Sequence, residues 1–173
     1  MTESYRRRPE TRRDTEMRSA WSRSLIFPKG CRYADGCEQI SEMLLDFDAF
    51  LAQVPGLEQA GANDLRLVCD ELVANVLRHV SVEKDATVEI GLQSRMDRVV
   101  LRIRDNGEDF DCFNQPTPYL GGDLDARRVG GLGLYLIKQL FPHGCHKRED
   151  GWNVSQVEYC MGEEGRLLMG REN

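Results

Sequence analysis

The sequence contains the stretch DELVANVLRH at residues 70–79. At about 100° between successive residues of an α-helix, one side of this stretch groups four polar side chains: Glu71, Asn75, Arg78 and His79. The opposite side is apolar and consists of Leu65, Cys69, Leu72, Val73, Val76, Leu77 and Val80. The spacing therefore predicts an amphipathic helix that begins at residue 63 or 64 with Asn or Asp as its cap and ends at residue 79 or 80.

The polar side of this helix has two interpretations. The amide oxygen of Asn75 is a hard ligand suited to Mg²⁺, and the Glu71 carboxylate, one turn away, can accept a proton. Alternatively, the side is simply solvated, with Glu71 and Arg78 contributing a few tenths of a kcal/mol through charge pairing. Because amphipathic helices are common, this stretch alone does not decide between a ligand site and a solvated face.

Further elements are predicted on both sides of this helix. In chain order they are a strand at 21–27, a helix at 35–54, the helix above, a hairpin of strands at 86–92 and 99–104, a helix at 133–140, and strands at 153–161 and 166–169. The order predicts an α+β fold, a two-layer sandwich in which helices cover one face of a mixed or antiparallel sheet.

Composition and charge narrow the class of protein. The 173 residues fit one domain at 21–173, preceded by a basic tail at 1–20 that we expect to be disordered. Residues 1–29 carry eight Lys/Arg and four Asp/Glu (+4), so that a net charge of −6 leaves −10 on the remainder. An acidic body argues against nucleic-acid binding. No stretch is as apolar as a membrane span or a secretory signal, which argues against membrane and exported proteins.

The six cysteines indicate the compartment. They form no CxxC pair and no zinc-finger spacing, so reduced thiols in the cytoplasm are expected. His143, Cys145 and His146 could offer metal ligands, but no second matching pair accompanies them.

A second motif, RDNGEDFD at residues 104–111, directly follows an apolar strand. The Asp105 carboxylate accepts hydrogen bonds and cannot donate them, so it favours a ligand edge with an amino group, as adenine has. Gly107 allows the backbone to approach such a ligand closely. The alternative is an acidic turn, because Asp-Asn-Gly is strong turn chemistry in any protein.

A third motif, VGGLGLYLIK at residues 129–138, ends a loop of about two dozen residues that is typical of a lid or binding loop. Gly131, Leu132 and Gly133 open an apolar helix, and a bare run of backbone N–H groups at a helix N-terminus suits phosphate. GxxxxGK[ST] is absent, and the context differs from a dinucleotide-binding fold. The alternative is a flexible loop that ends in glycine.

Taken in order, the three motifs resemble the N-box and the two glycine boxes of the GHKL ATP-binding superfamily. Within it, residues 105–111 and 130–136 are similar to the anti-sigma-factor serine kinases of the bacterial general-stress and sporulation switches. The resemblance covers about residues 22–170 and implies the Bergerat sandwich, with ATP between the helical layer and the lid.

The resemblance also implies roles for particular residues. Asn75 would hold Mg²⁺ against the phosphates, and Glu71 would be the general base that takes the proton of an attacking serine hydroxyl. Asp105 would accept the adenine amino group in a pocket shaped by Gly107. The phosphate-binding residues would be Gly131, Leu132 and Gly133. His79 matches the last N-box position, where a structural histidine at the helix end is an equal alternative.

The activity implied is phosphoryl transfer from ATP to a serine of a small anti-anti-sigma protein of the STAS type. The same cytoplasmic protein, a homodimer as is common in the family, would alternate between that antagonist and an RNA polymerase sigma factor. Two alternatives stay open. One is a catalytically silent ATP-binding interaction module, and the other is a histidine-kinase catalytic domain.

Two positions depart from the family pattern. Asp109 occupies the second glycine of the DxGxG pattern, although stress-type members also have a non-glycine there and Asp tolerates left-handed backbone. The last strand usually starts with Gly-Thr, whereas Gly165 is followed by Arg166, so no hydroxyl contact to adenine is expected there. Arg127 and Arg128 lie too early before the glycines to be assigned to the γ-phosphate.

Overall fold

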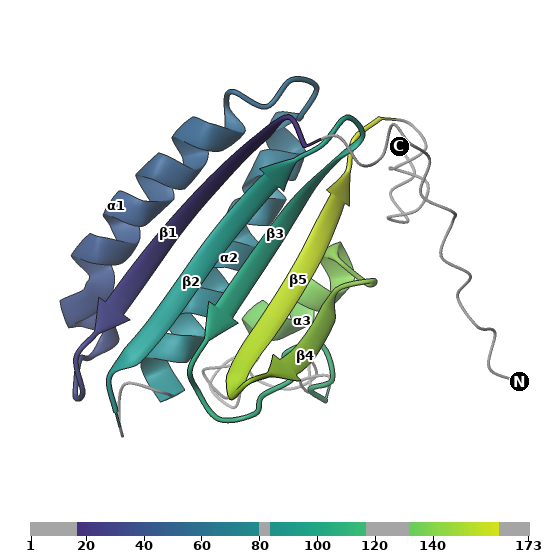
Figure 1. The fold of residues 1–173 in the computed structure, drawn as a ribbon. Coiled ribbons are helices and arrows are strands. Elements are labelled where there is room, and N and C mark those ends of the chain that lie inside the picture. The colour runs from purple at the N-terminus through teal and green to yellow at the C-terminus, as the bar shows by residue number, and fades with distance from the viewer. Residues whose placement is uncertain (1–16, 80–83, 117–131, 163–173) are drawn as a thin grey trace, which may run out of the picture.

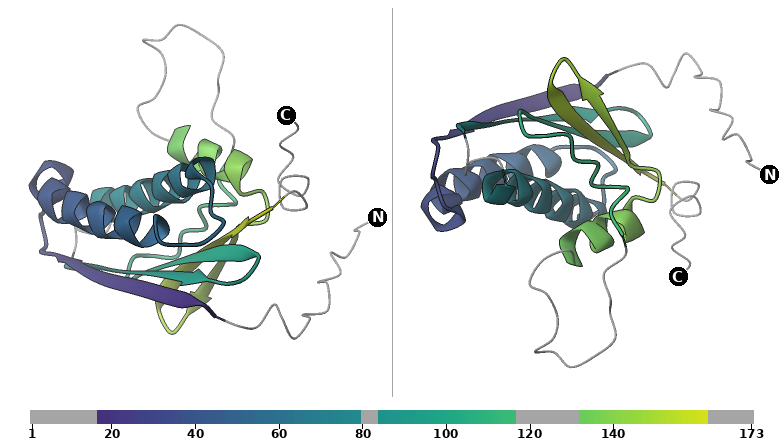
Figure 2. Two further views of the ribbon diagram at one scale, coloured as in Figure 1. Left: turned by 90° about the horizontal axis from the view of Figure 1, so that it is seen from above. Right: turned by 90° about the horizontal axis from the view of Figure 1, so that it is seen from below.

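A five-stranded antiparallel sheet runs through the protein, whose computed structural model describes residues 17–79, 84–116 and 132–162. The strands are β1 (Ser19–Phe27), β2 (Ala86–Ser94), β3 (Arg98–Asp105), β4 (Cys145–Glu149) and β5 (Trp152–Cys160), in the spatial order β1-β2-β3-β5-β4. The helices α1 (Tyr33–Leu51), α2 (Gln59–His79) and α3 (Leu132–Leu140) all lie on one face of the sheet (Figures 1 and 2). The predicted α+β two-layer sandwich is confirmed, with an antiparallel sheet.

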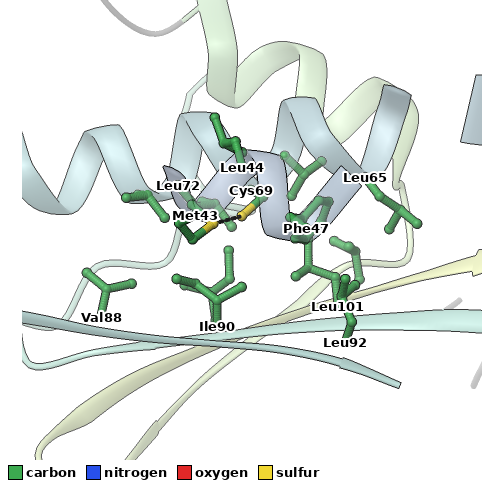
Figure 3. Close-up of a cluster of buried hydrophobic side chains, with 14 of the residues drawn as sticks. Met43, Leu44, Phe47, Leu65, Cys69, Leu72, Val88, Ile90, Leu92 and Leu101 are labelled. Atoms are coloured by element: carbon green, nitrogen blue, oxygen red, sulfur yellow. Dashed lines mark hydrogen bonds between the residues drawn. The ribbon is translucent and has the colours of Figure 1, made fainter. Parts of the chain in front are cut away.

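The core lies between the sheet and the helices (Figure 3). Alternate residues of β2 point inward, as the period of two along a strand requires, and α1 and α2 turn their apolar sides to them. The Sγ atom of Cys69 lies 4.0 Å from the Sδ atom of Met43, and burial raises the pKa of the Cys69 thiol far above its usual range. Cys69 therefore acts as a small apolar side chain in the core, as its sequence context indicates.

Phe47 of α1 has one of the largest fully buried side chains in the core. Its side chain is fully buried, and its ring meets Trp21 of β1 edge to face, with 5.7 Å between the ring centroids. Phe47→Ala is expected to lower the free energy of unfolding by about 3–5 kcal/mol, through lost burial and the cavity left behind. Urea denaturation measures this loss. Leu45→Ala, at a position on the same helix that is 69% exposed, is the matched control and should cost less than about 0.5 kcal/mol. Equal losses would contradict this core.

Helix α2 begins at Gln59, four residues before the predicted cap at residue 63, so that part of the prediction is wrong. The backbone N–H of Ala62 already donates to the carbonyl of Glu58 at 3.0 Å. Gly61 lies in this first turn, where a β-carbon would overlap the ring of Tyr159 on β5. Glycine is therefore needed for the close approach of helix and sheet, and its low helix propensity is outweighed by packing.

The last strands differ from the prediction. The predicted strand at 153–161 is β5, but its hairpin partner is β4, which was not predicted, and residues 166–169 lie outside the described residues. Strand β4 reads CHKRE and has no apolar alternation, because it is an edge strand that pairs only with β5. Asp150 and Gly151 join the two strands with φ of 49° and 82°, and positive φ at both positions is what a type I′ turn requires. The dipeptide Asp150-Gly151 is typical of such a turn and was the signal in the sequence for this hairpin.

Strand β1 begins at Ser19, and residues 1–16 of the predicted basic tail lie outside the described residues. No helix within the described ranges is long and apolar enough to cross a bilayer.

Candidate functional site

The first and third motifs meet where α2 packs against α3. Glu71 lies at the middle of α2, partly buried, and Gly133 lies in the first turn of α3. A β-carbon at position 133 would overlap the Glu71 carboxylate, so the two residues are in direct contact. The structure therefore places a carboxylate beside the start of a helix, where backbone N–H groups lack intrahelical partners.

Asn75 lies one turn after Glu71 on α2 and is also partly buried. Its Oδ1 atom accepts a hydrogen bond from Nη1 of Arg78 at 3.2 Å. His79, the last residue of α2, is exposed. The polar side of the helix is thus built as the spacing predicts, with an amide oxygen near a guanidinium and a carboxylate one turn away.

The start of α3 carries the remaining phosphate-binding candidates. Leu132 is the first residue of α3 and Gly133 the second, while Gly131 lies outside the described residues. Arg127 and Arg128 also lie outside them. The predicted helix start is confirmed to within one residue, and the predicted loop at 105–130 is described only as far as residue 116.

Asp105 is the last residue of β3, and one of its two carboxylate oxygens is fully engaged. Oδ1 accepts the backbone N–H of Gly107 at 2.9 Å and Nδ2 of Asn153, also at 2.9 Å. Gly107 itself is buried, and its carbonyl accepts Nη1 of Arg148 at 2.7 Å. Within the described part of the chain, Oδ2 of Asp105 has no hydrogen-bond partner, which leaves it available to a ligand.

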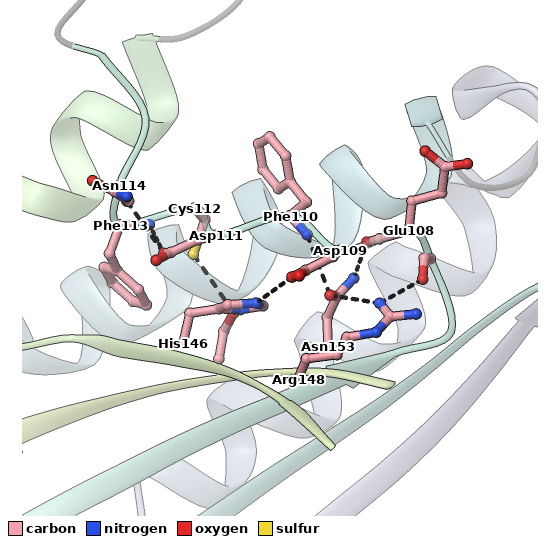
Figure 4. Close-up of polar contacts among 12 residues, drawn as sticks. Glu108, Asp109, Phe110, Asp111, Cys112, Phe113, Asn114, His146, Arg148 and Asn153 are labelled. Carbon is pink, nitrogen blue, oxygen red and sulfur yellow. Dashed lines mark hydrogen bonds and ion pairs between the residues drawn. The ribbon is translucent and has the colours of Figure 1, made fainter. Parts of the chain in front are cut away.

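Asn153 lies beside Asp105 in the candidate site and was not predicted from the sequence. It is only 3% exposed, and its side chain joins the loop after β3 to β5 (Figure 4). Besides its bond to Asp105, Nδ2 donates to the carbonyl of Glu108 at 2.6 Å, and Oδ1 accepts the backbone N–H of Phe110 at 3.3 Å. The sequence does contain a signal for this residue. The first two inward positions of β5 are polar, Asn153 and Ser155, whereas the later inward positions are apolar.

Asn153 provides a polar contact from a strand that pairs with the end of β3. Gly165 and Arg166, which differ from the Gly-Thr of the family pattern, lie outside the described residues. The strand that pairs with the end of β3 is β5, and it follows Gly151. Strand β5 therefore places a side-chain amide, that of Asn153, beside Asp105.

Asn106 anchors the loop after β3 from the other side. Its Oδ1 accepts the backbone N–H of Thr87 at 3.0 Å, and its Nδ2 donates to the carbonyl of Asp85 at 3.0 Å. Asp109, which stands where the family pattern has a glycine, does not adopt positive φ. A side chain is therefore tolerated at position 109 without backbone strain.

A second group of side chains lies under the same loop (Figure 4). His146 is nearly buried, with Nε2 3.4 Å from Oδ1 of Asp109 and Nδ1 3.4 Å from Oγ of Ser155. Cys112 lies 3.6 Å from the same Oγ, and burial raises the pKa of its thiol to about 11, so that it stays protonated at neutral pH. No group of three His, Cys, Asp or Glu side chains suited to a metal ion occurs among the described residues.

Comparison with known proteins identifies the family. Residues 34–155, more than half of the chain, match the histidine kinase-like ATPase domain. The chain belongs to this family. The serine-protein kinase RsbW of Listeria innocua is 28% identical over 114 residues, which cover 63% of this chain and 73% of that protein. The serine-protein kinase RsbW of Staphylococcus epidermidis is 30% identical over 110 residues, which cover 60% of this chain and 69% of that protein.

Membership of the ATPase domain family agrees with the observed fold and identifies ATP as the ligand type of the domain. All the predicted site residues lie within the matched range: Glu71, Asn75, Asp105, Gly107, Gly131, Leu132 and Gly133. The structure brings Glu71 to Gly133, and Asp105 to Gly107 and Asn153.

Proposed function

We propose that this protein is an ATP-dependent serine kinase and an anti-sigma factor. It phosphorylates a serine of a cognate anti-anti-sigma protein of the STAS type and, in alternation, sequesters an RNA polymerase sigma factor. The observation that carries this proposal is the Glu71 carboxylate against the first turn of α3, the helix start to which we assign phosphate binding. Similarity to serine-protein kinases named RsbW supports the same activity.

In the proposed reaction, each group of this chain has one task. Oδ2 of Asp105 accepts the adenine amino group, and the backbone N–H groups at Gly131, Leu132 and Gly133 donate to the phosphates. Glu71 takes the proton of the serine hydroxyl while the serine oxygen bonds to the γ-phosphorus. At the same time the bond between the γ-phosphorus and the β-phosphate oxygen breaks, and ADP leaves. Catalysis of this kind is mostly positioning and charge neutralisation.

The residues present fit Mg²⁺ as the accompanying ion. Asn75 offers a partly buried amide oxygen on the same helix side as Glu71, and oxygen atoms are the ligands that Mg²⁺ prefers. When bound, Mg²⁺ neutralises charge on the phosphates. Asn75 would hold it through its side-chain oxygen.

Calorimetric titration with ATP and with GTP, each with and without Mg²⁺, tests the nucleotide site first. The second step incubates the protein with γ-labelled ATP and candidate STAS-type proteins, and identifies the labelled residue. Label on a serine, together with sigma-factor binding, supports the proposal. Binding without transfer favours the silent interaction module, and label on a histidine of this chain favours the histidine-kinase alternative. No binding of either nucleotide would refute all three.

The proposal also covers compartment and assembly. We place the protein in the cytoplasm, where the sigma factor and its antagonist are found. We also propose that it is a homodimer. Sedimentation equilibrium of the purified protein measures the mass of the assembly. A monomer at cellular concentrations would exclude the homodimer. The kinase activity is tested separately, by the transfer experiment.

Gly133→Ala tests the contact between α3 and Glu71. The new methyl group would displace the Glu71 carboxylate, which is the end of a flexible side chain, so the free energy of unfolding should change by about 1 kcal/mol or less. Phosphoryl transfer should fall at least about tenfold, because a small misplacement of a catalytic group is costly. Gly91→Ala on β2 is the control, since the nearest atom to its new methyl group is 3.9 Å away. Equal transfer rates in both variants would count against the assigned contact.

A further inference from the structure

We infer that Asn153, held in orientation by Arg148, makes the site select adenine over guanine by leaving Asp105 a single free carboxylate oxygen. This inference rests on the proposed function, in which Asp105 contacts the nucleobase. Asn153 and Arg148 are positioning residues here, since both act through Asp105.

The three side chains lie in one row across three neighbouring strands. Asp105 on β3 pairs with Asn153 on β5, and Asn153 pairs with Arg148 on β4. Because strand register sets this row, the three side chains start from neighbouring positions of the sheet.

The orientation of the Asn153 amide is determined by its partners. Nη1 of Arg148 lies 2.8 Å from Oδ1 of Asn153, and a guanidinium can only donate, so this atom must be the amide oxygen. The amide nitrogen therefore faces Asp105 and the carbonyl of Glu108. With two bonds accepted and two donated, Asn153 has its full complement of hydrogen bonds, and a flipped amide would set its oxygen against the Asp105 carboxylate.

The consequence is a carboxylate whose two oxygens are not equivalent. Oδ1 of Asp105 already accepts the N–H of Gly107 and the amide of Asn153, whereas Oδ2 is left for a ligand. Adenine presents one amino donor beside a ring acceptor, so one oxygen satisfies it. Guanine presents a ring N–H beside an amino group, two parallel donors that pair with both oxygens of a free carboxylate. With Oδ1 occupied, guanine leaves one donor unpaired, and an unpaired buried donor is costly.

The test is the ratio of the dissociation constants of GTP and ATP, measured by calorimetry with Mg²⁺ on the full chain. Asn153→Ala removes one of the two hydrogen bonds that Oδ1 accepts, so that Oδ1 can accept a second donor from guanine. The ratio should therefore fall at least about fivefold relative to the unmodified protein. Arg148→Met, at an exposed position, should lower the ratio in the same direction by allowing the amide to turn. Asn106→Ala is the matched control. It removes an amide that anchors the same loop without touching Asp105, so it should leave the ratio unchanged.

A purely structural role would weaken ATP and GTP binding alike, so only the ratio reports on selection. An unchanged ratio in Asn153→Ala that still binds ATP overturns the inference. If Asn153→Ala does not fold, judged by circular dichroism, an unchanged ratio in Arg148→Met overturns it instead. If the unmodified protein binds neither nucleotide, the proposed function fails, and the inference with it, before any variant is compared.

Discussion

Glu71→Gln is expected to reduce the rate of phosphoryl transfer by about 10²–10⁴-fold, because general-base catalysis typically contributes that much. Glutamine keeps the shape of the side chain beside Gly133 but cannot accept the serine proton. ATP affinity should stay within about threefold, because Glu71 acts on the serine in the transition state rather than on bound nucleotide. Single-turnover transfer from γ-labelled ATP to the cognate anti-anti-sigma protein measures the rate, and calorimetry measures the affinity.

The control for this experiment is Glu42→Gln, which removes an exposed carboxylate from α1. It should leave both transfer and ATP affinity unchanged. If Glu71→Gln transferred phosphate at the normal rate, the role of Glu71 as base would have to be withdrawn. Retained ATP binding would then still support a nucleotide-binding module.

Asn75→Ala should remove the contribution of Mg²⁺ to ATP affinity. Losing even an outer partner of a metal ligand typically costs about 10–100-fold in metal affinity, so loss of the ligand itself should weaken Mg·ATP binding by at least about 100-fold. The affinity for ATP without Mg²⁺ should change little, since Asn75 is assigned to the ion. Calorimetric titrations of the variant with and without Mg²⁺ separate the two contributions.

Asn63→Ala provides the matched control, an amide removed from an exposed position on the same helix. Among the described residues it loses the hydrogen bond that Nε2 of Gln59 donates to Asn63, and it should retain the full effect of Mg²⁺. If Asn75→Ala kept the same Mg²⁺ dependence as Asn63→Ala, Asn75 would not be the ion's ligand, and the polar side of α2 would be better interpreted as solvated.

Most elements of the fold could be predicted because their patterns are local and strong. The hairpin of β2 and β3 alternates apolar and polar residues, and the helices repeat apolar side chains at helical spacing. Strand β4 could not be found in this way, since an edge strand of charged residues buries no apolar side and has no period to detect. The start of α2 was predicted too late because Gly61 has a low helix propensity. Its place in the helix depends on close packing against Tyr159, which helix propensity does not describe.

The residues of the candidate site could be predicted individually, but the contacts between them could not. The spacing of Glu71 and Asn75 depends only on helix geometry, and the position of Asp105 depends only on where an apolar strand ends. Their assigned roles in binding and catalysis remain predictions. Asn153 and Arg148 were not predicted, because their importance comes from strand pairing and not from any motif around them.

By itself, the sequence determined the kinds of elements, their order and the three motifs, because periodicity, turn residues and helix starts are set by local backbone geometry. Only the tertiary structure decided which motifs share a site. In the tertiary structure Gly133 contacts Glu71, and Asn153 lies beside Asp105, 48 positions away in the sequence. Such contacts depend on how helices pack and on the strand order β3-β5-β4, in which the last strand of the hairpin inserts between its partner and β3. A local pattern carries no information about that choice of neighbour.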